Sequence, residues 1–90
     1  MTQNEAKTML LDVLVALDLM SAEGRAAAQK PGAKDIPLGS LGIDSLAVVD
    51  LCVGVEERTG RELHVEEIID NPTIDQLAAY LAASVPAARA

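Results

Sequence analysis

The sequence predicts an all-α domain, a bundle of three longer helices and one short helix. Half of the 90 residues are apolar, yet the chain has one Tyr and no Phe or Trp, so the core must be built from aliphatic side chains, a composition that favours helices. Apolar residues recur at helical spacing in separate stretches, and no stretch carries a β-hairpin signal. A chain of this length makes one small domain, expected to span residues 1–90.

The first helix is expected at residues 5–20, with Asn4 as its N-cap. Leu11, Val15 and Leu19 widen the apolar stripe until the helix is apolar nearly all round, which indicates burial between other helices. A helix lying on a membrane surface would instead carry basic residues on a polar face. We therefore expect no membrane contact. The stripe itself consists of Ala6, Met9, Leu10, Val13, Leu14 and Leu17.

A long connection, residues 21–43, follows this helix and is rich in glycine and proline. We expect part of it to be mobile. Residues 26–29 are compatible with one helical turn, which Pro31 ends, while Leu38 and Leu41 attach the end of the connection to the core. The side chains that make the connection locally basic, and that we expect to be solvated, are Arg25, Lys30 and Lys34.

The second helix is expected at residues 45–58. Ser45 is the candidate N-cap, and Asp44 adds a negative charge at the positive end of the helix dipole. Gly60 is placed to end the helix in the left-handed conformation. Gly54, inside the helix, costs about 1 kcal/mol relative to alanine. A glycine at this position indicates either that another helix crosses closely or that the helix is locally more flexible.

Two faces of the second helix differ in character. One is apolar and is expected to join the core: Val48, Leu51, Cys52 and Val55. The other mixes apolar side chains with carboxylates: Leu46, Val49, Asp50, Val53, Glu56 and Glu57. By itself such a face is compatible with an ordinary solvated surface or with a docking surface, in which a small apolar contact is surrounded by charge.

A short helix is expected at residues 65–70, because Pro72 prevents its continuation. Thr73 then caps a final helix at residues 73–83. The tail, residues 84–90, is expected to fray. The apolar residues around the short helix that we expect to point inward are Leu63, Ile68 and Ile69.

The net charge of −7 disfavours binding to nucleic-acid phosphates and suits partners with basic surfaces. Because Cys52 is the only cysteine, neither an internal disulfide nor a cysteine-based zinc site is possible, and its place on the apolar face indicates a small core residue. The first residues lack a basic segment, and Asp12 and Asp18 interrupt the apolar run that follows, unlike a signal peptide or a membrane span. We expect a cytoplasmic protein.

Catalysis by this chain alone is disfavoured. A hydrolase would need Ser45 as nucleophile, His64 as base and an acid such as Asp44 or Asp70, but the serine is not in a Gly-x-Ser-x-Gly motif and the chain has a single histidine. No metal site is expected, because the acidic residues do not form an Asp-x-Asp-x-Asp-Gly calcium loop.

Residues 41–46 read Leu-Gly-Ile-Asp-Ser-Leu and place Ser45 where a loop ends and a helix begins. This stretch resembles the phosphopantetheine attachment motif of acyl carrier proteins. The similarity extends with order and spacing kept from Asp35 to Ala83. The stretches that carry it are Asp-Ile-Pro-Leu before the motif, Val-Val-Asp-Leu and Val-Glu-Glu-Arg-Thr-Gly after it, and finally Ile-Ile-Asp-Asn-Pro-Thr-Ile-Asp-Gln-Leu.

The resemblance implies a four-helix acyl-carrier-like bundle that acts as a covalent carrier and not as an enzyme. A phosphopantetheinyl transferase would move 4′-phosphopantetheine from coenzyme A onto Ser45, between Asp44 and Leu46, and the terminal thiol would hold a substrate as a thioester. The other implied partners are an acyl- or aminoacyl-loading enzyme and synthase, condensing or tailoring enzymes, and we expect the chain to be a monomer. By matched position the partner-binding residues are Leu46, Asp50, Val53, Glu56 and Glu57, with Ile68 and Ile69 able to close over or release an acyl chain.

Residues 71–78 are similar to polyketide and nonribosomal-peptide carrier domains, which favours a stand-alone carrier in specialised metabolism such as antibiotic biosynthesis. Ala47 and Arg58 depart from the acidic pattern of housekeeping fatty-acid carriers, and Asp44 favours an acyl load over an aminoacyl load. Two alternatives stay open: a peptidyl or aminoacyl carrier, and a carrier-like helical docking module that is never modified.

Overall fold

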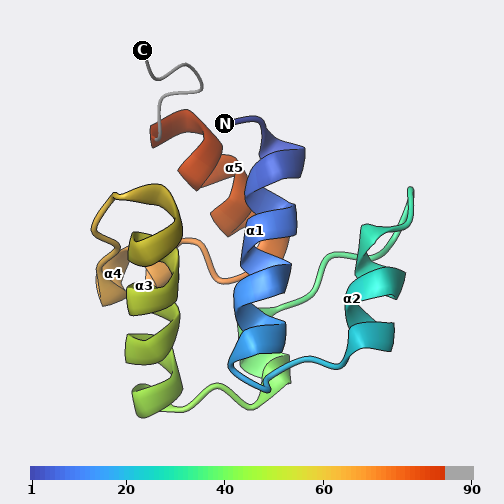
Figure 1. Ribbon diagram of the computed structural model, residues 1–90, viewed down its shortest axis with the longest axis horizontal. Coiled ribbons are helices and arrows are strands. Elements are labelled where there is room, and N and C mark those ends of the chain that lie inside the picture. Colours follow the sequence, from blue (N-terminus) through green and yellow to red (C-terminus); the bar gives the residue numbers. More distant parts are fainter. Residues whose placement is uncertain (85–90) are drawn as a thin grey trace.

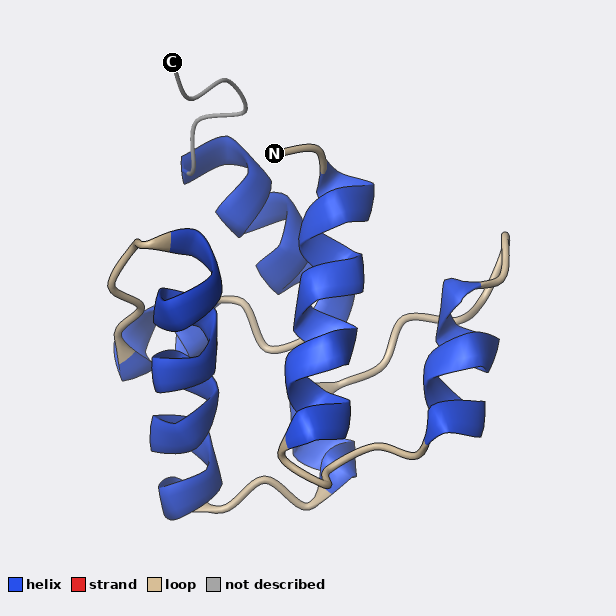
Figure 2. Ribbon diagram, viewed as in Figure 1, coloured by secondary structure: helices blue, strands red, loops and turns tan. Residues whose placement is uncertain are grey.

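The computed structural model describes residues 1–84, and it is all-helical over this range, with no strand, which confirms the predicted fold class. Figures 1 and 2 show helices joined by loops. The predicted tail lies outside the described residues apart from Ser84, which ends the last helix. The elements in chain order are α1 (Gln3–Ala16), α2 (Ala22–Gln29), the 3-10 helix η1 (Leu38–Leu41), α3 (Ser45–Thr59), α4 (Val65–Asp70) and α5 (Ile74–Ser84).

α1 is the central element of the bundle. It packs against α5, α3 and α2, and in Figure 1 the helices α3 and α2 lie on opposite sides of it. α4 lies beside α3 and packs against it. None of the described helices is both long and apolar enough to cross a membrane. The largest fully buried side chains are all aliphatic: Leu10, Leu11, Leu14, Leu51, Ile74, Leu77, Leu81, Val13 and Val55.

α1 begins and ends earlier than the sequence predicted. Its N-cap is Thr2 and not Asn4: Thr2 Oγ1 accepts a hydrogen bond from the backbone N–H of Glu5 at 3.1 Å, and Glu5 Oε1 accepts one from the Thr2 N–H at 2.8 Å. This capping box satisfies two backbone donors and so determines where the helix starts. At the other end Leu17 is the C-cap, and Asp18 adopts a left-handed φ of 62°, which ends the helix.

The connection over residues 21–43 contains α2, of which the sequence had indicated only one turn. The helix buries a single residue, Ala28, so it lacks the apolar stripe that reveals a helix in a sequence. Arg25, expected to be solvated, instead pairs with Asp12 of α1, with its Nε 2.7 Å from Asp12 Oδ1. α2 is thus held to α1 largely by polar contacts.

A short pairing of two extended segments joins the chain ahead of η1 to the start of α5. The backbone N–H of Leu38 donates to the carbonyl of Pro72 at 2.8 Å, and that of Ile74 donates to the carbonyl of Ile36 at 3.0 Å. Leu38 is buried, as predicted. These contacts fix the end of the long connection shortly before Ser45.

Asp35 strengthens this junction by capping α5 from outside the helix. Its carboxylate accepts hydrogen bonds from the hydroxyl of Thr73 at 2.6 Å and from the backbone N–H of Asp75 at 3.0 Å. Burial raises the pKa of Asp35, but these two hydrogen bonds outweigh burial and lower the pKa below its ordinary value. The ionised carboxylate also suits the positive end of the helix dipole.

Gly54 lies where α3 crosses α1. A Cβ atom at this position would be 2.7 Å from Cγ1 of Val13, closer than real contacts allow. Of the two explanations that the sequence left open, the structure supports the close crossing. Gly60 ends α3 with a φ of 72°, as predicted.

Candidate functional site

Ser45 is the first residue of α3, and Asp44, not Ser45, is the N-cap. Asp44 has an extended backbone, and its Oδ1 accepts a hydrogen bond from the backbone N–H of Ala47 at 2.8 Å. The expectation that Ser45 caps the helix is therefore wrong: the carboxylate one residue earlier already reaches the N–H that a cap must satisfy. Within residues 1–84 no hydrogen bond uses the Ser45 hydroxyl, which remains exposed and available for chemistry.

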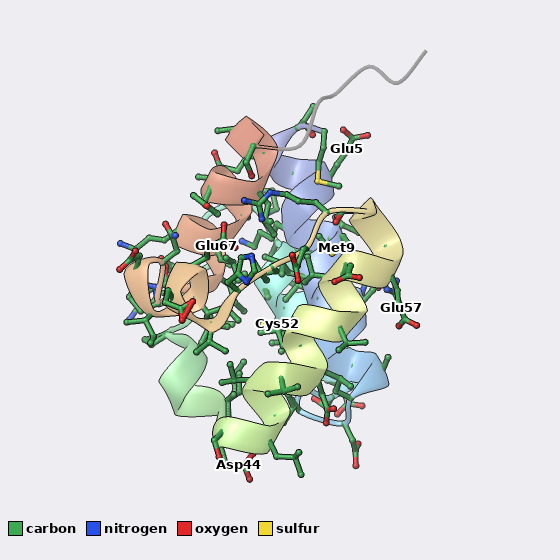
Figure 3. All side chains as sticks on the ribbon, turned by 90° about the vertical axis from the view of Figure 1, so that its left-hand side faces the viewer. Glu5, Met9, Asp44, Cys52, Glu57 and Glu67 are labelled. Carbon is green, nitrogen blue, oxygen red and sulfur yellow. The ribbon has the colours of Figure 1, made fainter. Side chains whose placement is uncertain are left out.

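The turn ahead of Ser45 holds this arrangement in place. η1 ends at Leu41, and Gly42 follows in the left-handed conformation with a φ of 70°. A residue with a side chain would be strained there, so glycine is favoured where the chain turns into α3. Figure 3 shows Asp44 at the free end of α3, pointing away from the body of the molecule. A partner can thus reach Ser45 without entering a cleft.

The first turn of a helix carries backbone N–H groups with no partner in the helix, and its dipole favours negative charge. Asp44 satisfies one of these groups, that of Ala47. A phosphodiester on the adjacent Ser45 would lie beside the remaining N–H groups of this turn. The exposed hydroxyl at the start of α3 therefore fits covalent attachment of a phosphate-containing group.

All large apolar side chains that are exposed within residues 1–84 lie on α3 and α4. We call the surface they form the α3–α4 surface; its apolar members are Leu46, Val49, Val53, Val65 and Ile69. Exposed acidic side chains lie on the same two helices, and Figure 3 shows Glu57 pointing outward near the far end of α3 from Asp44. The exposed carboxylates are Asp50, Glu56, Glu57, Glu66 and Asp70.

The structure separates the two isoleucines that were expected to point inward together. Ile68 is 7% exposed and lies in the core, whereas Ile69 is 68% exposed, so the expectation is wrong for Ile69. Consecutive residues of an α-helix point about 100° apart, and α4 turns the side of Ile68 to the core, so Ile69 points to solvent. Val65, which sequence reasoning missed, shares the exposed face with Ile69 because the two are four residues apart.

An apolar pocket of about 180 Å³ lies between η1, α3 and α4. Two of its lining residues, Ile43 and Val48, flank Ser45 in the sequence, and Ile68 forms the wall on α4. The complete lining is Leu38, Gly39, Ile43, Val48, Ile68 and Pro72. The buried side chain of Ile68 thus lines this pocket.

The residues of a serine hydrolase are not brought together. His64 precedes α4, beyond the C-terminal end of α3, whereas Ser45 starts α3. With a rise of about 1.5 Å per residue, these two ends lie roughly 20 Å apart. The carboxylate that pairs with the His64 ring is that of Glu62, with 3.5 Å between His64 Nε2 and Glu62 Oε1. No group of three or more His, Cys, Asp or Glu residues within the described range is placed to hold a metal ion.

Cys52 is buried on α3, as predicted. Burial raises the pKa of its thiol, and the negative charge of Glu67 raises it further. The thiol therefore stays protonated at neutral pH, which makes it a core residue and not a reactive one.

A protein-family model described as the phosphopantetheine attachment site matches residues 17–81. No curated protein and no solved structure matches the chain. The family match covers more than half of the chain and includes η1, the whole of α3 and α4, and Ser45 itself. The Ser45 hydroxyl at the start of α3 is exposed and does not cap the helix, so it fits covalent attachment of the 4′-phosphopantetheine group of such domains. The chain therefore belongs to the phosphopantetheine-attachment family, whose members are carrier domains of the acyl carrier protein type.

Proposed function

We propose that this protein is an acyl carrier whose Ser45 hydroxyl receives 4′-phosphopantetheine from coenzyme A through a phosphopantetheinyl transferase. The serine oxygen bonds to the phosphorus next to pantetheine, the pyrophosphate bond of coenzyme A breaks, and adenosine 3′,5′-bisphosphate leaves. The observation that carries this assignment is the exposed Ser45 at the start of α3, left free because Asp44 takes over the capping. When bound, the arm supplies a terminal thiol that holds an acyl group as a thioester. The chain then acts as a covalent shuttle, and the chemistry of each step belongs to partner enzymes.

Asp44 is a positioning residue in this proposal. Its carboxylate fixes the first turn of α3 through the N–H of Ala47, so that the serine hydroxyl is presented outward. Leu46, which follows Ser45, is 70% exposed and offers an apolar contact beside the attachment point. A transferase that approaches this end meets a hydroxyl, a carboxylate and an apolar side chain together.

The α3–α4 surface is the proposed docking site for the transferase and for loading, condensing or tailoring enzymes. Exposed apolar side chains with carboxylates on the same two helices fit a partner with an apolar groove and basic residues at its rim. The predicted partner-binding residues Leu46, Asp50, Val53, Glu56, Glu57 and Ile69 are all exposed on it, and Val49 and Val65 join them. Ile68 is buried and would contribute from within, as a wall of the pocket.

A carrier in polyketide or related specialised metabolism is the proposed context. What supports this context is the similarity of residues 71–78 to polyketide and nonribosomal-peptide carrier domains. A peptidyl or aminoacyl carrier is the alternative, since the load depends on the loading enzyme. A docking module that is never modified is the second alternative.

The test is the intact-protein mass after incubation with coenzyme A and a permissive phosphopantetheinyl transferase. We expect the mass to rise by one arm in the unaltered protein and in Ser40→Ala, and to stay unchanged in Ser45→Ala. Ser40 is the matched control, because it is an exposed serine on η1 whose hydroxyl only donates to the carbonyl of Pro37, at 2.7 Å. No addition to a protein that circular dichroism shows to be folded would favour the unmodified docking module.

A further inference from the structure

Three polar side chains tie α4 to α5 and to the loop that precedes α4. Oε2 of Glu67 accepts hydrogen bonds from Nη2 of Arg61, at 2.6 Å, and from the hydroxyl of Tyr80. The same Nη2 also donates to the Tyr80 oxygen at 3.2 Å, and the guanidinium carbon lies 5.4 Å from the centre of the tyrosine ring. Arg61 belongs to the loop, Glu67 to α4 and Tyr80 to α5, so three segments meet at one carboxylate.

Both oxygens of Glu67 are engaged. Oε1 accepts a hydrogen bond from the backbone N–H of His64 at 2.7 Å, and the side chain is only 15% exposed. Hydrogen bonds from Arg61 and then Tyr80 lower the pKa of Glu67 to about 2, so the carboxylate is ionised at neutral pH. Charge-assisted contacts of this kind are the stronger class of hydrogen bond in proteins.

α4 has little else to hold it. The helix has six residues and buries one of them, Ile68, whereas a helix of this length is not stable without tertiary contacts. Ile68 is also the wall that α4 contributes to the apolar pocket near Ser45. The position of α4, and with it the width of this pocket, therefore depends on the polar cluster as well as on apolar burial.

We propose that Arg61, Glu67 and Tyr80 form a latch that ties α4 to α5 and to the loop before α4, and in this way keeps α4 in place beside α3 and the apolar pocket narrow. When the latch is released, α4 separates from α3 while α1 and α5 stay folded. The separation opens the wall formed by Ile68 and uncovers the side of α3 that faces α4. This inference concerns the unmodified protein, so it stands whether or not Ser45 receives an arm.

Cys52 provides a built-in reporter of the separation. It is the only cysteine, it is buried, and it lies on α3 near enough to α4 for the charges of Glu67 and Glu66 to act on its thiol. A thiol reagent such as 5,5′-dithiobis(2-nitrobenzoic acid) modifies a buried cysteine only when its cover opens. The rate of modification therefore measures opening of the structure around Cys52, and amide exchange of α4 shows whether α4 is the segment that moves.

The experiment compares the unaltered protein with Arg61→Gln, with the milder Tyr80→Phe and with the matched control Glu66→Gln. Glu66 is the exposed neighbour of Glu67 on α4, so its replacement removes a carboxylate but leaves the latch intact. Loss of the positive charge of Arg61 does not favour the thiolate, so faster modification of that variant reports opening and not altered thiol chemistry. Amide hydrogen exchange of α4 and α1, measured over a series of low denaturant concentrations, accompanies the thiol assay.

We expect Cys52 modification and α4 amide exchange to accelerate about tenfold or more in Arg61→Gln, and less in Tyr80→Phe. Glu66→Gln should change neither rate beyond the small effect of its charge on the thiol. The α4 amides should also depend less steeply on denaturant than the α1 amides, because a local opening exposes less surface than unfolding. Unchanged rates in Arg61→Gln, or equal denaturant slopes for α4 and α1, would overturn the proposal.

Discussion

α1 and α4 are both helices of one small bundle, but they are held by different forces. α1 has 14 residues and buries six of them, all apolar, against α5, α3 and α2. α4 has six residues, buries Ile68 alone and is tied down by the carboxylate of Glu67. Apolar burial does not depend on pH, whereas a charged hydrogen-bond cluster does. The two regions should therefore fail under different conditions.

The largest effect is expected from Leu14→Ala in α1, because Leu14 is fully buried at the centre of the bundle. Removing its side chain should lower the free energy of unfolding by about 2–5 kcal/mol, through lost burial and the cavity left behind. Leu46→Ala is the matched control, since the same substitution at an exposed site should change stability by less than about 0.5 kcal/mol. Chemical denaturation followed by circular dichroism measures both. Similar losses in the two variants would contradict the assignment of α1 as the central, buried element.

An intermediate effect is expected from acid, and it should trace to α4. The pKa of Glu67 is about 2 in the folded protein, because of the hydrogen bonds from Arg61 and Tyr80, and about 4.3 in an unfolded chain. A lowered pKa means that the stabilisation is fully present above about pH 5 and is lost as the pH falls toward 2. At neutral pH the protein should be more stable than Glu67→Gln by about 1–3 kcal/mol.

The measurement is the free energy of unfolding of both proteins at a series of pH values between about 7 and 2. The difference between their free energies of unfolding should shrink through the acid range. Protonation of Glu67 removes its negative charge from the unaltered protein, and the variant already lacks that charge. Asp35 also has a lowered pKa, caused by Thr73 and Asp75 against the effect of burial, and it adds to the acid sensitivity of both proteins equally. A difference that stays constant with pH would mean that the charge of Glu67 does not stabilise α4.

Much of the fold could be predicted because its signals are local in the sequence. Pro72 ends α4, Gly60 ends α3 in a left-handed conformation, and the motif places Ser45 at a helix start. The sequence predicted only one turn of α2. This helix is attached by polar contacts such as that of Arg25 with Asp12, so its sequence shows no apolar periodicity. Such contacts join residues far apart in the chain, and spacing does not reveal them.

The sequence predicted where the site lies, but not which residue caps α3 or which isoleucine of α4 is exposed. Both Asp44 and Ser45 are good cap residues, and only the backbone of Asp44 decides which of them does the capping. Ile68 and Ile69 are chemically alike, and the packing of α4 alone determines which one is exposed. The Glu67 cluster joins three segments, so neither its partners nor its effect on α4 could be read from the sequence.

The smallest effect is expected from Gly54→Ala, which tests how closely α1 is fitted to α3. Alanine favours a helix over glycine by about 1 kcal/mol, so an exposed position would gain stability. Here the new Cβ would lie 2.7 Å from Cγ1 of Val13, whose β-branched side chain is stiff and buried. Overpacking of a core costs roughly 1–3 kcal/mol, so a net loss of about 1 kcal/mol should remain.

Val13→Ala provides the control, because it removes the methyl group that the new Cβ would meet. In that background Gly54→Ala should become neutral or stabilising, so the double-mutant cycle should show a coupling of about 1 kcal/mol or more. Thermal and chemical denaturation of the four proteins give the cycle. A destabilisation by Gly54→Ala that persists without Val13 would show that glycine serves the flexibility of α3, and the contrast between a closely fitted α1 and a loosely held α4 would then no longer stand.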